Sequence, residues 1–320
     1  QNCYRIRVWS FIEAASANRL FKKRAGTTTQ TRELAPERYS LIVRFLARTL
    51  RRIVVLALGI FSVWLIVFVI FDITDNRLPW ILALAITYGI AAYVVLPRIV
   101  RISLKVLQRK RVPRYTTTGD GFPGDPINLV LIGTLAQLDG AFGNCGWSVA
   151  EKLNLASCLR MARTFVLNKS YPTAPFSTLY LFGRGQDIGF QKAIGDSPRK
   201  RHHVRFWALS LERAEATLGT ADFWFNTDRP PLDTSVLWIG AATKDTGFSL
   251  TKLTFQITHA TDPDTNIERD YILDELKKNG AIIDVNMYRA RQLLPVARVN
   301  HYVTDGEVVV ASLATSPGVS

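Results

Sequence analysis

The sequence predicts an α+β protein in which a two-helix transmembrane hairpin precedes a cytoplasmic domain with a mixed α/β sheet. Residues 53–71 and 78–96 carry no charge, whereas short β-branched and aromatic segments recur after residue 125 between helical patterns. The 320 residues suffice for a membrane part and one domain of ordinary size. We expect four regions: a basic cytoplasmic segment (1–52), the hairpin (53–97), a basic helix extension with linker (98–124) and the α+β domain (125–320).

The two uncharged segments have the length of membrane helices. Each has 19 residues, and at about 1.5 Å per residue each nearly spans a bilayer core of roughly 30 Å. Buried helices of a soluble core are the weaker alternative, because core helices of this length usually carry polar positions. The short sequence DITDNR between them predicts a tight hairpin, and Trp80 suits the membrane interface.

Basic residues on both outer flanks predict the orientation of the hairpin. Arg51 and Arg52 precede the first segment, and Arg98 and Arg101 follow the second. Because Lys and Arg resist translocation, both ends should be cytoplasmic, in a multi-pass protein of the inner membrane. Further membrane segments upstream of Gln1 stay open.

The net charge of +14 lies beside the membrane segments. Residues 115–320 carry 20 basic and 21 acidic side chains, so residues 1–52 and 98–114 hold the excess. Attraction to anionic lipids explains this distribution, and nucleic acid is not an expected partner. The amphipathic segment 41–50 is expected to lie along the membrane surface before the chain turns inward.

The soluble part has a mixed pattern of strands and helices. Residues 112–126, rich in Pro, Gly and Thr, are interpreted as a linker, with the domain beginning near Asp125. Helices are expected after Thr134, which can cap the first, over 149–167, and from Ile267 to Lys278. Strands are expected at 127–133, 177–182, 202–209, 221–225, 236–243, 253–261, 281–288, 297–304 and 307–313.

The acidic stretch DPDTNIERD (262–270) resembles the start of an EF-hand loop. That interpretation fails, because Ile267 replaces the glycine of the sharp turn and Leu273 replaces the closing glutamate. A capping box explains part of the stretch, with Thr265 as the cap and Glu268 three residues later. Asp264 adds favourable charge at the helix start.

Two sets of residues are candidates for binding chemistry. His259 with Asp262 or Asp264 forms a candidate site for a divalent metal, although a histidine bonded to a backbone carbonyl is commoner. In RKRHHVRFW, strand alternation places His202 and His203 on opposite faces, which argues against a shared metal. Arg201, His203 and Arg205 are candidates for gripping a phosphate, against the alternative of a solvated basic edge.

Several enzyme classes lack their motifs. Gly183, Gly185 and Gly189 are spaced one residue too widely for a dinucleotide loop. The sequence contains no P-loop, no G-x-S-x-G elbow and no H-E-x-x-H helix. Three cysteines without a C-x-x-C pair give no disulfide framework. Only a metal or phosphate site has residues to support an enzyme.

Motifs in series resemble the LssY C-terminal domain family over about residues 125–285. They are DPINLVLIG, YPTAPFSTLYLFGRGQDIGFQK, RKRHHVRFW, LWIGAATKD and ITHATDPDTNIERDYIL. The resemblance implies an envelope- or lipid-related role and no established reaction. The family pattern often has a second histidine and a third aspartate in its last motif, where this chain has Ala260 and Asn266. Glu268, Arg269 and Asp270 are expected to form ion pairs with the basic strand.

These observations favour a membrane-anchored binding or assembly module, as an accessory subunit of a membrane complex. The expected partners are anionic lipids and either other membrane proteins or further copies of the chain. Two alternatives stay open. One is a metal-assisted phosphoesterase acting on a lipid or small phosphate, and the other is an anionic-lipid sensor that uses residues 1–52.

Overall fold

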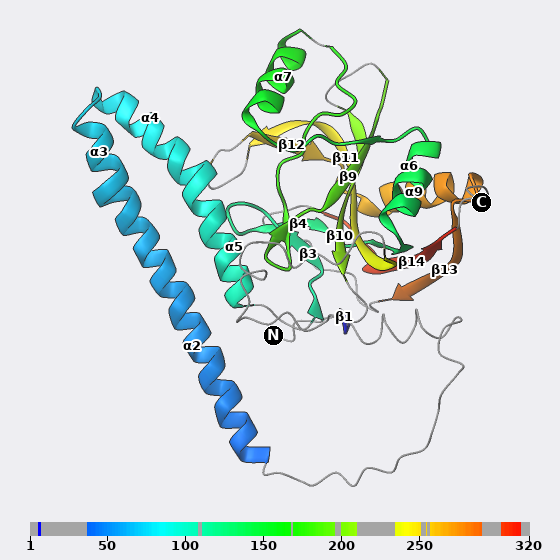
Figure 1. The fold of residues 1–320 in the computed structure, drawn as a ribbon, viewed down its shortest axis with the longest axis horizontal. Coiled ribbons are helices and arrows are strands. Elements are labelled where there is room, and N and C mark those ends of the chain that lie inside the picture. The colour runs from blue at the N-terminus through cyan, green and yellow to red at the C-terminus, as the bar shows by residue number, and fades with distance from the viewer. Residues whose placement is uncertain are drawn as a thin grey trace. The chain divides into compact units, whose positions relative to one another are not determined.

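The computed structural model describes residues 6–7, 37–107, 111–167, 169–195, 200–209, 234–250, 254, 257–289 and 302–314. The chain divides into two compact units, a helical unit over Arg7–Arg111 and a second unit that contains Val112–Ser320. Figure 1 labels many of the elements of both. The strands β1 (Ile6–Arg7) and β2 (Arg111–Val112) form a separate two-stranded sheet.

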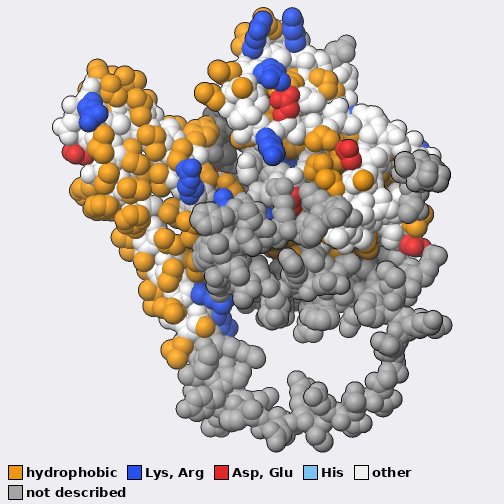
Figure 2. Space-filling view, in the orientation of Figure 1, with side chains coloured by type: hydrophobic (Ala, Val, Ile, Leu, Met, Phe, Trp, Pro, Cys, Tyr) orange, Lys and Arg blue, Asp and Glu red, His pale blue; other side chains and the backbone are white. Residues whose placement is uncertain are grey.

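The helical unit contains two helices long and apolar enough to cross a membrane, Phe45–Asp75 and Trp80–Val106. The first joins α2 (Glu37–Trp64), the wider π-type turns of η1 (Leu65–Phe71) and α3 (Asp72–Asp75). The second joins α4 (Trp80–Ile90), η2 (Ala91–Val95) and α5 (Leu96–Val106). Hydrophobic side chains cover most of their visible surface (Figure 2).

Both helices are longer than the apolar segments that predicted them. The expected turn from a surface helix into the membrane is wrong, because α2 runs without a break from Glu37 past Arg51 and Arg52. The wide turns of η2 immediately precede Pro97, whose ring would crowd the carbonyl four residues back in a regular helix.

Small side chains allow the two helices to approach each other. Ala83 and Ala92 are buried, and the hydroxyl oxygens of Thr74 and Thr87 lie 3.0 Å apart. Thr74 also bonds the carbonyls of Ile70 and Phe71 in its own helix. Such contacts are typical of helix pairs in membranes, where apolar surface alone drives little association.

The second unit is built on an eight-stranded mixed sheet. Its order is β13-β14-β5-β11-β10-β9-β6, with β12 added to β11, and only β14 and β5 run parallel. The predicted α+β class with a mixed sheet is therefore confirmed. The strands are β5 (Leu129–Gly133), β6 (Ser148–Val149), β9 (Ile188–Ala193), β10 (Arg201–Leu209), β11 (Val236–Leu250), β12 (Ile257–Thr261), β13 (Ile282–Arg289) and β14 (Glu307–Leu313).

Helices α6 (Leu135–Asn144) and α9 (Thr265–Lys278) cover one face of this sheet. Phe142 of α6 and Ile272 of α9 pack in a core with Phe206 of β10 and Trp238 of β11. Thr134 caps α6 as expected, in a capping box with Gln137. The predicted second helix is shorter than expected, because α7 (Leu155–Val166) begins only after Asn154.

A four-stranded sheet of order β4-β3-β7-β8 lies against the other face. Its strands are β3 (Tyr115–Thr117), β4 (Pro123–Pro126), β7 (Tyr180–Leu181) and β8 (Arg184–Gly185). The prediction of a linker over 112–126 is wrong, because these residues pair into strands and bury Thr116 and Asp125. Gly121, at φ 89°, lies in the turn between β3 and β4.

Two predicted strands lie largely outside the described residues. Residues 221–225 are not described at all, and of 297–304 only 302–304 are. Within the latter, Val303 forms an isolated bridge with Asp264. The strand expected at 177–182 is reduced to β7, because Phe182 and Gly183 both adopt positive φ in a tight hairpin turn.

Candidate functional site

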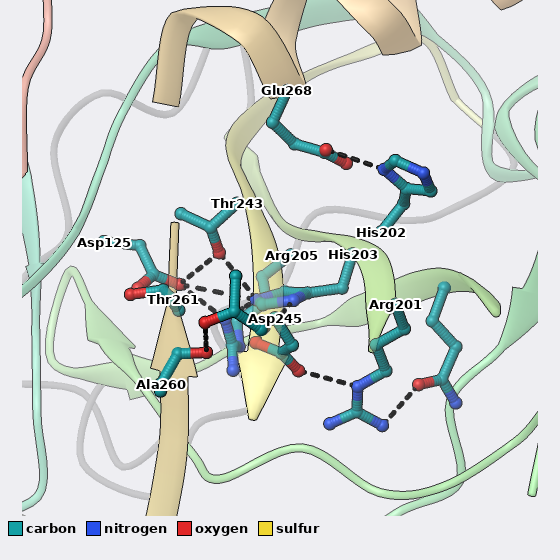
Figure 3. Close-up of polar contacts among 12 residues, drawn as sticks. Asp125, Arg201, His202, His203, Arg205, Thr243, Asp245, Ala260, Thr261 and Glu268 are labelled. Carbon is teal, nitrogen blue, oxygen red and sulfur yellow. Dashed lines mark hydrogen bonds and ion pairs between the residues drawn. The ribbon is translucent and has the colours of Figure 1, made fainter. Parts of the chain in front are cut away.

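Strand β10 carries the candidate residues, and its alternation decides which face each one meets. Val204 and Phe206 point into the helix-covered core. Arg201, His203 and Arg205 point to the opposite face, where all three are buried (Figure 3). This arrangement agrees with the alternation predicted from the sequence, but the basic residues are interior and do not form a solvated edge.

Two carboxylates from other strands compensate the buried arginines. Asp125 of β4 accepts a hydrogen bond from Nη1 of Arg205. Asp245 of β11 accepts one from Nε of Arg201 at 2.7 Å. Gln191 of β9 accepts another from Nη1 of Arg201 at 2.6 Å. Removing one partner of such a buried pair leaves an uncompensated charge, which costs about 3–5 kcal/mol.

His203 lies at the centre of this cluster, and its contacts define its tautomer. Nε2 lies 2.7 Å from Nη1 of Arg205 and 2.7 Å from Oγ1 of Thr243. A guanidinium can only donate, so Nε2 must be an acceptor and the imidazole is neutral. The ring proton is then on Nδ1, which lies 3.2 Å from Oδ1 of Asp245.

The aromatic ring of Phe176 packs against the cluster. Its ring centroid lies 5.0 Å from Cζ of Arg201, 4.9 Å from Cζ of Arg205 and 5.2 Å from the His203 ring. A face shared by two guanidinium groups gives cation–π attraction in a desolvated setting. Gly189 makes room for it, because a Cβ there would lie 2.4 Å from Cε2 of Phe176.

A hydroxyl chain joins the cluster to β12. Tyr302 donates to Oδ1 of Asp125 at 2.7 Å and lies 3.0 Å from Oγ1 of Thr261. Burial raises the pKa of Asp125, but the charge of Arg205 and the hydrogen bond from Tyr302 lower it, so the pKa is lowered overall. Burial next to this carboxylate raises the pKa of Tyr302 well above its usual value.

Asn128 fixes the sheet beside the cluster. Its side-chain carbonyl accepts from the Ala242 amide, and its amide donates to the Ala242 carbonyl, each at 3.0 Å. The same amide reaches the Thr265 carbonyl at 3.2 Å. Asn128 therefore imitates a strand partner along β11, between the end of its pairing with β5 and the start of its pairing with β12.

His202 contacts helix α9 on the face of the sheet that the helices cover, away from the cluster. Its Nδ1 lies 2.7 Å from Oε2 of Glu268 in α9, and its ring stacks on Tyr271 at 4.1 Å. Burial raises the pKa of Glu268, and the hydrogen bond with His202 only partly offsets it. Ion pairs between the basic strand and the acidic helix were expected from the sequence; this contact joins the two elements, and it is an ion pair only when His202 is protonated.

The predicted capping box at Thr265 is wrong. Asp264 is the cap, and its Oδ1 accepts from the amides of Asn266 and Ile267. Thr265 instead lies inside the first turn, where it is buried, and Glu268 points to His202. Asp and Thr are both good capping residues, so the sequence does not say which of the two precedes the helix. The helix begins one residue earlier than predicted, and Asp264 is therefore the cap.

Arg269 pairs with Asp270 and with Asp305 of the C-terminal segment, in place of the expected pairing with the basic strand. Nε of Arg269 lies 2.8 Å from Asp270, and its two terminal nitrogens bind both carboxylate oxygens of Asp305 at 3.0 and 3.1 Å. The bidentate contact with Asp305 has the geometry of the stronger arginine pairs.

The candidate metal ligands have other uses where the structure describes them. Oδ1 of Asp262 accepts from the Asp264 amide at 3.1 Å, and Asp264 caps α9. The side chain of His259 lies outside the described residues. Among the residues that are described, no group of three or more His, Cys, Asp or Glu side chains is placed to hold a metal.

The membrane-interface candidates all lie on the two long helices. Arg51 and Arg52 are in α2, exposed Trp80 begins α4, and Arg98 and Arg101 are in α5.

Sequence reasoning missed the residues that meet the basic strand, which are Asp125, Phe176, Gln191, Thr243 and Asp245, and it missed Tyr302 behind Asp125. The one available signal was a charged residue at the end of an apolar strand, as in VLWIGAATKD. Pairing register brings Thr243 opposite His203 and Asp245 opposite Arg201, and a single sequence does not reveal register.

Comparison with known proteins gives one result. The family model described as LssY C-terminus matches residues 109–308, well over half of the chain. No curated protein and no solved structure matches the chain significantly.

Proposed function

We propose, from the premise that this chain belongs to the LssY C-terminus family, that it is a membrane-anchored binding or assembly module. In this proposal the second unit, which contains Val112–Ser320 and is called the soluble unit from here on, is cytoplasmic. The chain serves as an accessory subunit of an inner-membrane complex with an envelope- or lipid-related role. Its partners are anionic lipids and either other membrane proteins or further copies of the chain.

One observation carries the proposal. The charged cluster around Arg201, His203 and Arg205 is buried and compensated by Asp125 and Asp245 of the same chain. Such a cluster uses its polar groups to fix how the sheet, β4 and the Phe176 segment fit together. This supports a module that presents a fixed surface to partners.

Assembly is tested on the full chain, extracted gently from its membranes and analysed by mass photometry. We expect particles larger than one 35.9 kDa chain with its detergent. Arg205→Ala should disrupt the soluble unit and return the particles to single chains, whereas Lys277→Ala on the exposed end of α9 should not. Single chains at all concentrations, in detergent and in nanodiscs, would contradict the proposal.

Orientation needs a separate experiment, in a background with Cys3, Cys145 and Cys158 replaced. One variant then carries Asn76→Cys at the hairpin tip, and its matched partner carries Asn279→Cys after α9; both positions are exposed. A membrane-impermeant maleimide applied to intact cells should label the tip and not the α9 variant. Labelling of the α9 variant would overturn the cytoplasmic placement.

A metal-assisted phosphoesterase is the second candidate function. It is favoured by the contact of His203 with Arg205 and with the hydroxyl of Thr243, and by the Phe176 ring that Arg201 and Arg205 share. Purified full chain supplied with Mg²⁺ or Mn²⁺ should then release phosphate from phosphatidic acid vesicles. Asp262→Ala should abolish that activity, whereas Asp274→Ala, at an exposed position of α9, should retain it. If the unaltered chain releases no phosphate, this function is excluded.

The third candidate, lipid sensing by residues 1–52, concerns a segment of which the structure describes 6–7 and 37–52. It predicts salt-sensitive binding of charged vesicles.

A further inference from the structure

Helix α7 exposes a row of apolar side chains. Leu155, Leu159 and Val166 are 78%, 64% and 79% exposed. Their spacing of four and then seven residues places them on one side of the helix, together with exposed Ala162. Ser157, on the opposite side, is buried. Single exposed apolar residues are ordinary, but an aligned row indicates an interaction surface.

The charged side chains around this row are mostly basic, and Glu151, just before the helix, pairs with Arg160 at 3.0 Å. From residue 152 to residue 170 the chain contains Lys152, Arg160, Arg163 and Lys169 and no acidic residue. The whole of residues 115–320 is nearly neutral, so this segment differs from the rest of the soluble unit. Figure 2 shows basic and hydrophobic side chains next to one another over α7.

Hydrogen bonds fix α7 at its N-terminal end, and the rest of the helix packs little against other described elements. Asn154 and Ser157 cap it reciprocally, through backbone-to-side-chain bonds of 2.8 and 2.9 Å. Below the cap, Glu151 accepts from the hydroxyls of Tyr171 and Thr173. Because an isolated helix of 12 residues is only marginally stable in water, contact with a further surface would favour it.

We propose that α7 docks on the surface of an anionic lipid bilayer. Leu155, Leu159 and Val166 enter the boundary between headgroups and acyl chains, and the flanking basic residues meet lipid phosphates. Two features favour lipid over a protein partner. The charge of residues 152–170 is positive, and only residues 107–111 connect the apolar helix ending at Val106 to the soluble unit.

This short connection keeps the soluble unit near whatever bilayer holds the helices. Five residues reach at most about 18 Å, so docking is effectively an intramolecular event. A weak affinity of α7 for lipid is then enough for docking. The inference concerns a different surface from the buried cluster, and it stands or falls independently of any assembly or catalytic role.

Hydrogen exchange of the full chain in nanodiscs tests the inference. The amides of α7 should exchange about tenfold more slowly when about a third of the lipid is phosphatidylglycerol than in pure phosphatidylcholine. High salt should remove much of that difference, because screening weakens attraction between the basic residues and the lipid.

Leu159→Glu with Val166→Glu should abolish the lipid-dependent protection. The control pair, Ile267→Glu with Met287→Glu, makes the same charge change at residues that are 61% and 57% exposed elsewhere, and should leave it intact. Unchanged exchange in β10 and β11 shows that both variants fold. Equal exchange of α7 in the two lipids, or protection that depends on protein concentration and not on lipid charge, would overturn the inference.

Discussion

At the scale of single residues, each of the two buried arginines of strand β10 lies beside a carboxylate. Arg201 and Arg205 face Asp245 and Asp125, and a neutral His203 accepts from Arg205 between them. The described cluster therefore has no net charge in this protonation state. Buried pairs contribute little net stability compared with apolar packing, but they strongly penalise any arrangement that separates the partners.

Asp125→Asn should destabilise the soluble unit by about 3–5 kcal/mol, because Arg205 would remain buried without a counter-charge. Unfolding of the full chain in detergent, followed by tryptophan fluorescence, measures the effect. Asp139→Asn on the exposed side of α6 is the control and should change little. Equal stability of the two variants would show that this ion pair is unimportant.

The same carboxylate predicts a dependence on pH. Folding lowers the pKa of Asp125, so its contribution is present above the unfolded pKa, about 3.9, and is lost as the pH falls through the folded value. Stability of the unaltered chain should therefore decline below about pH 4. In Asp125→Asn this decline should be shallower, and an unchanged slope would assign the acid sensitivity to other groups.

Gly189→Ala should cost about 1–3 kcal/mol, because the new methyl group would overlap Phe176. Phe176→Leu in the same chain should relieve part of that cost, which a double-mutant cycle detects as coupling. Gly143→Ala is the control. It lies in α6 with open space around it, so it should be neutral or slightly stabilising.

At the scale of elements, the local sequence predicted whether a segment is a helix or a strand better than it predicted where that helix or strand begins and ends. The apolar runs and the pattern of α9 gave the correct kind of structure, whereas the ends of α2, α7 and β7 shifted. The capping residues explain part of these shifts in boundary. Asn154 and Ser157 cap α7, so that helix begins at Leu155, later than expected. Asp264 caps α9 in place of Thr265, so that helix begins one residue earlier.

The cap of α9 can be tested directly. Asp264→Ala should lower stability by about 0.5–2 kcal/mol, because two amides lose their acceptor. Asp264→Asn keeps an acceptor oxygen and should retain most of the stability. Thermal unfolding separates the two variants, and a loss of equal size in both would point to the charge of Asp264 in place of its hydrogen bonds.

At the scale of the whole molecule, an apolar helical unit and a folded mixed α/β unit share one chain. The full chain should stay in the membrane fraction after washing with high salt and then with alkaline carbonate, and detergent should release it. The physical reason is that Phe45–Asp75 and Trp80–Val106 each offer enough apolar length to cross a bilayer core. Release by carbonate alone would show peripheral attachment.

The sequence by itself determined the two apolar helices, the α+β class of the soluble unit and the opposite faces of His202 and His203. These features follow from local hydrophobicity and strand alternation, which a single segment contains. Tertiary structure alone decided which carboxylates meet the basic strand. Asp125 and Asp245 lie 80 and 44 residues from their arginines, and strand order and register bring them together through the packing of the whole sheet.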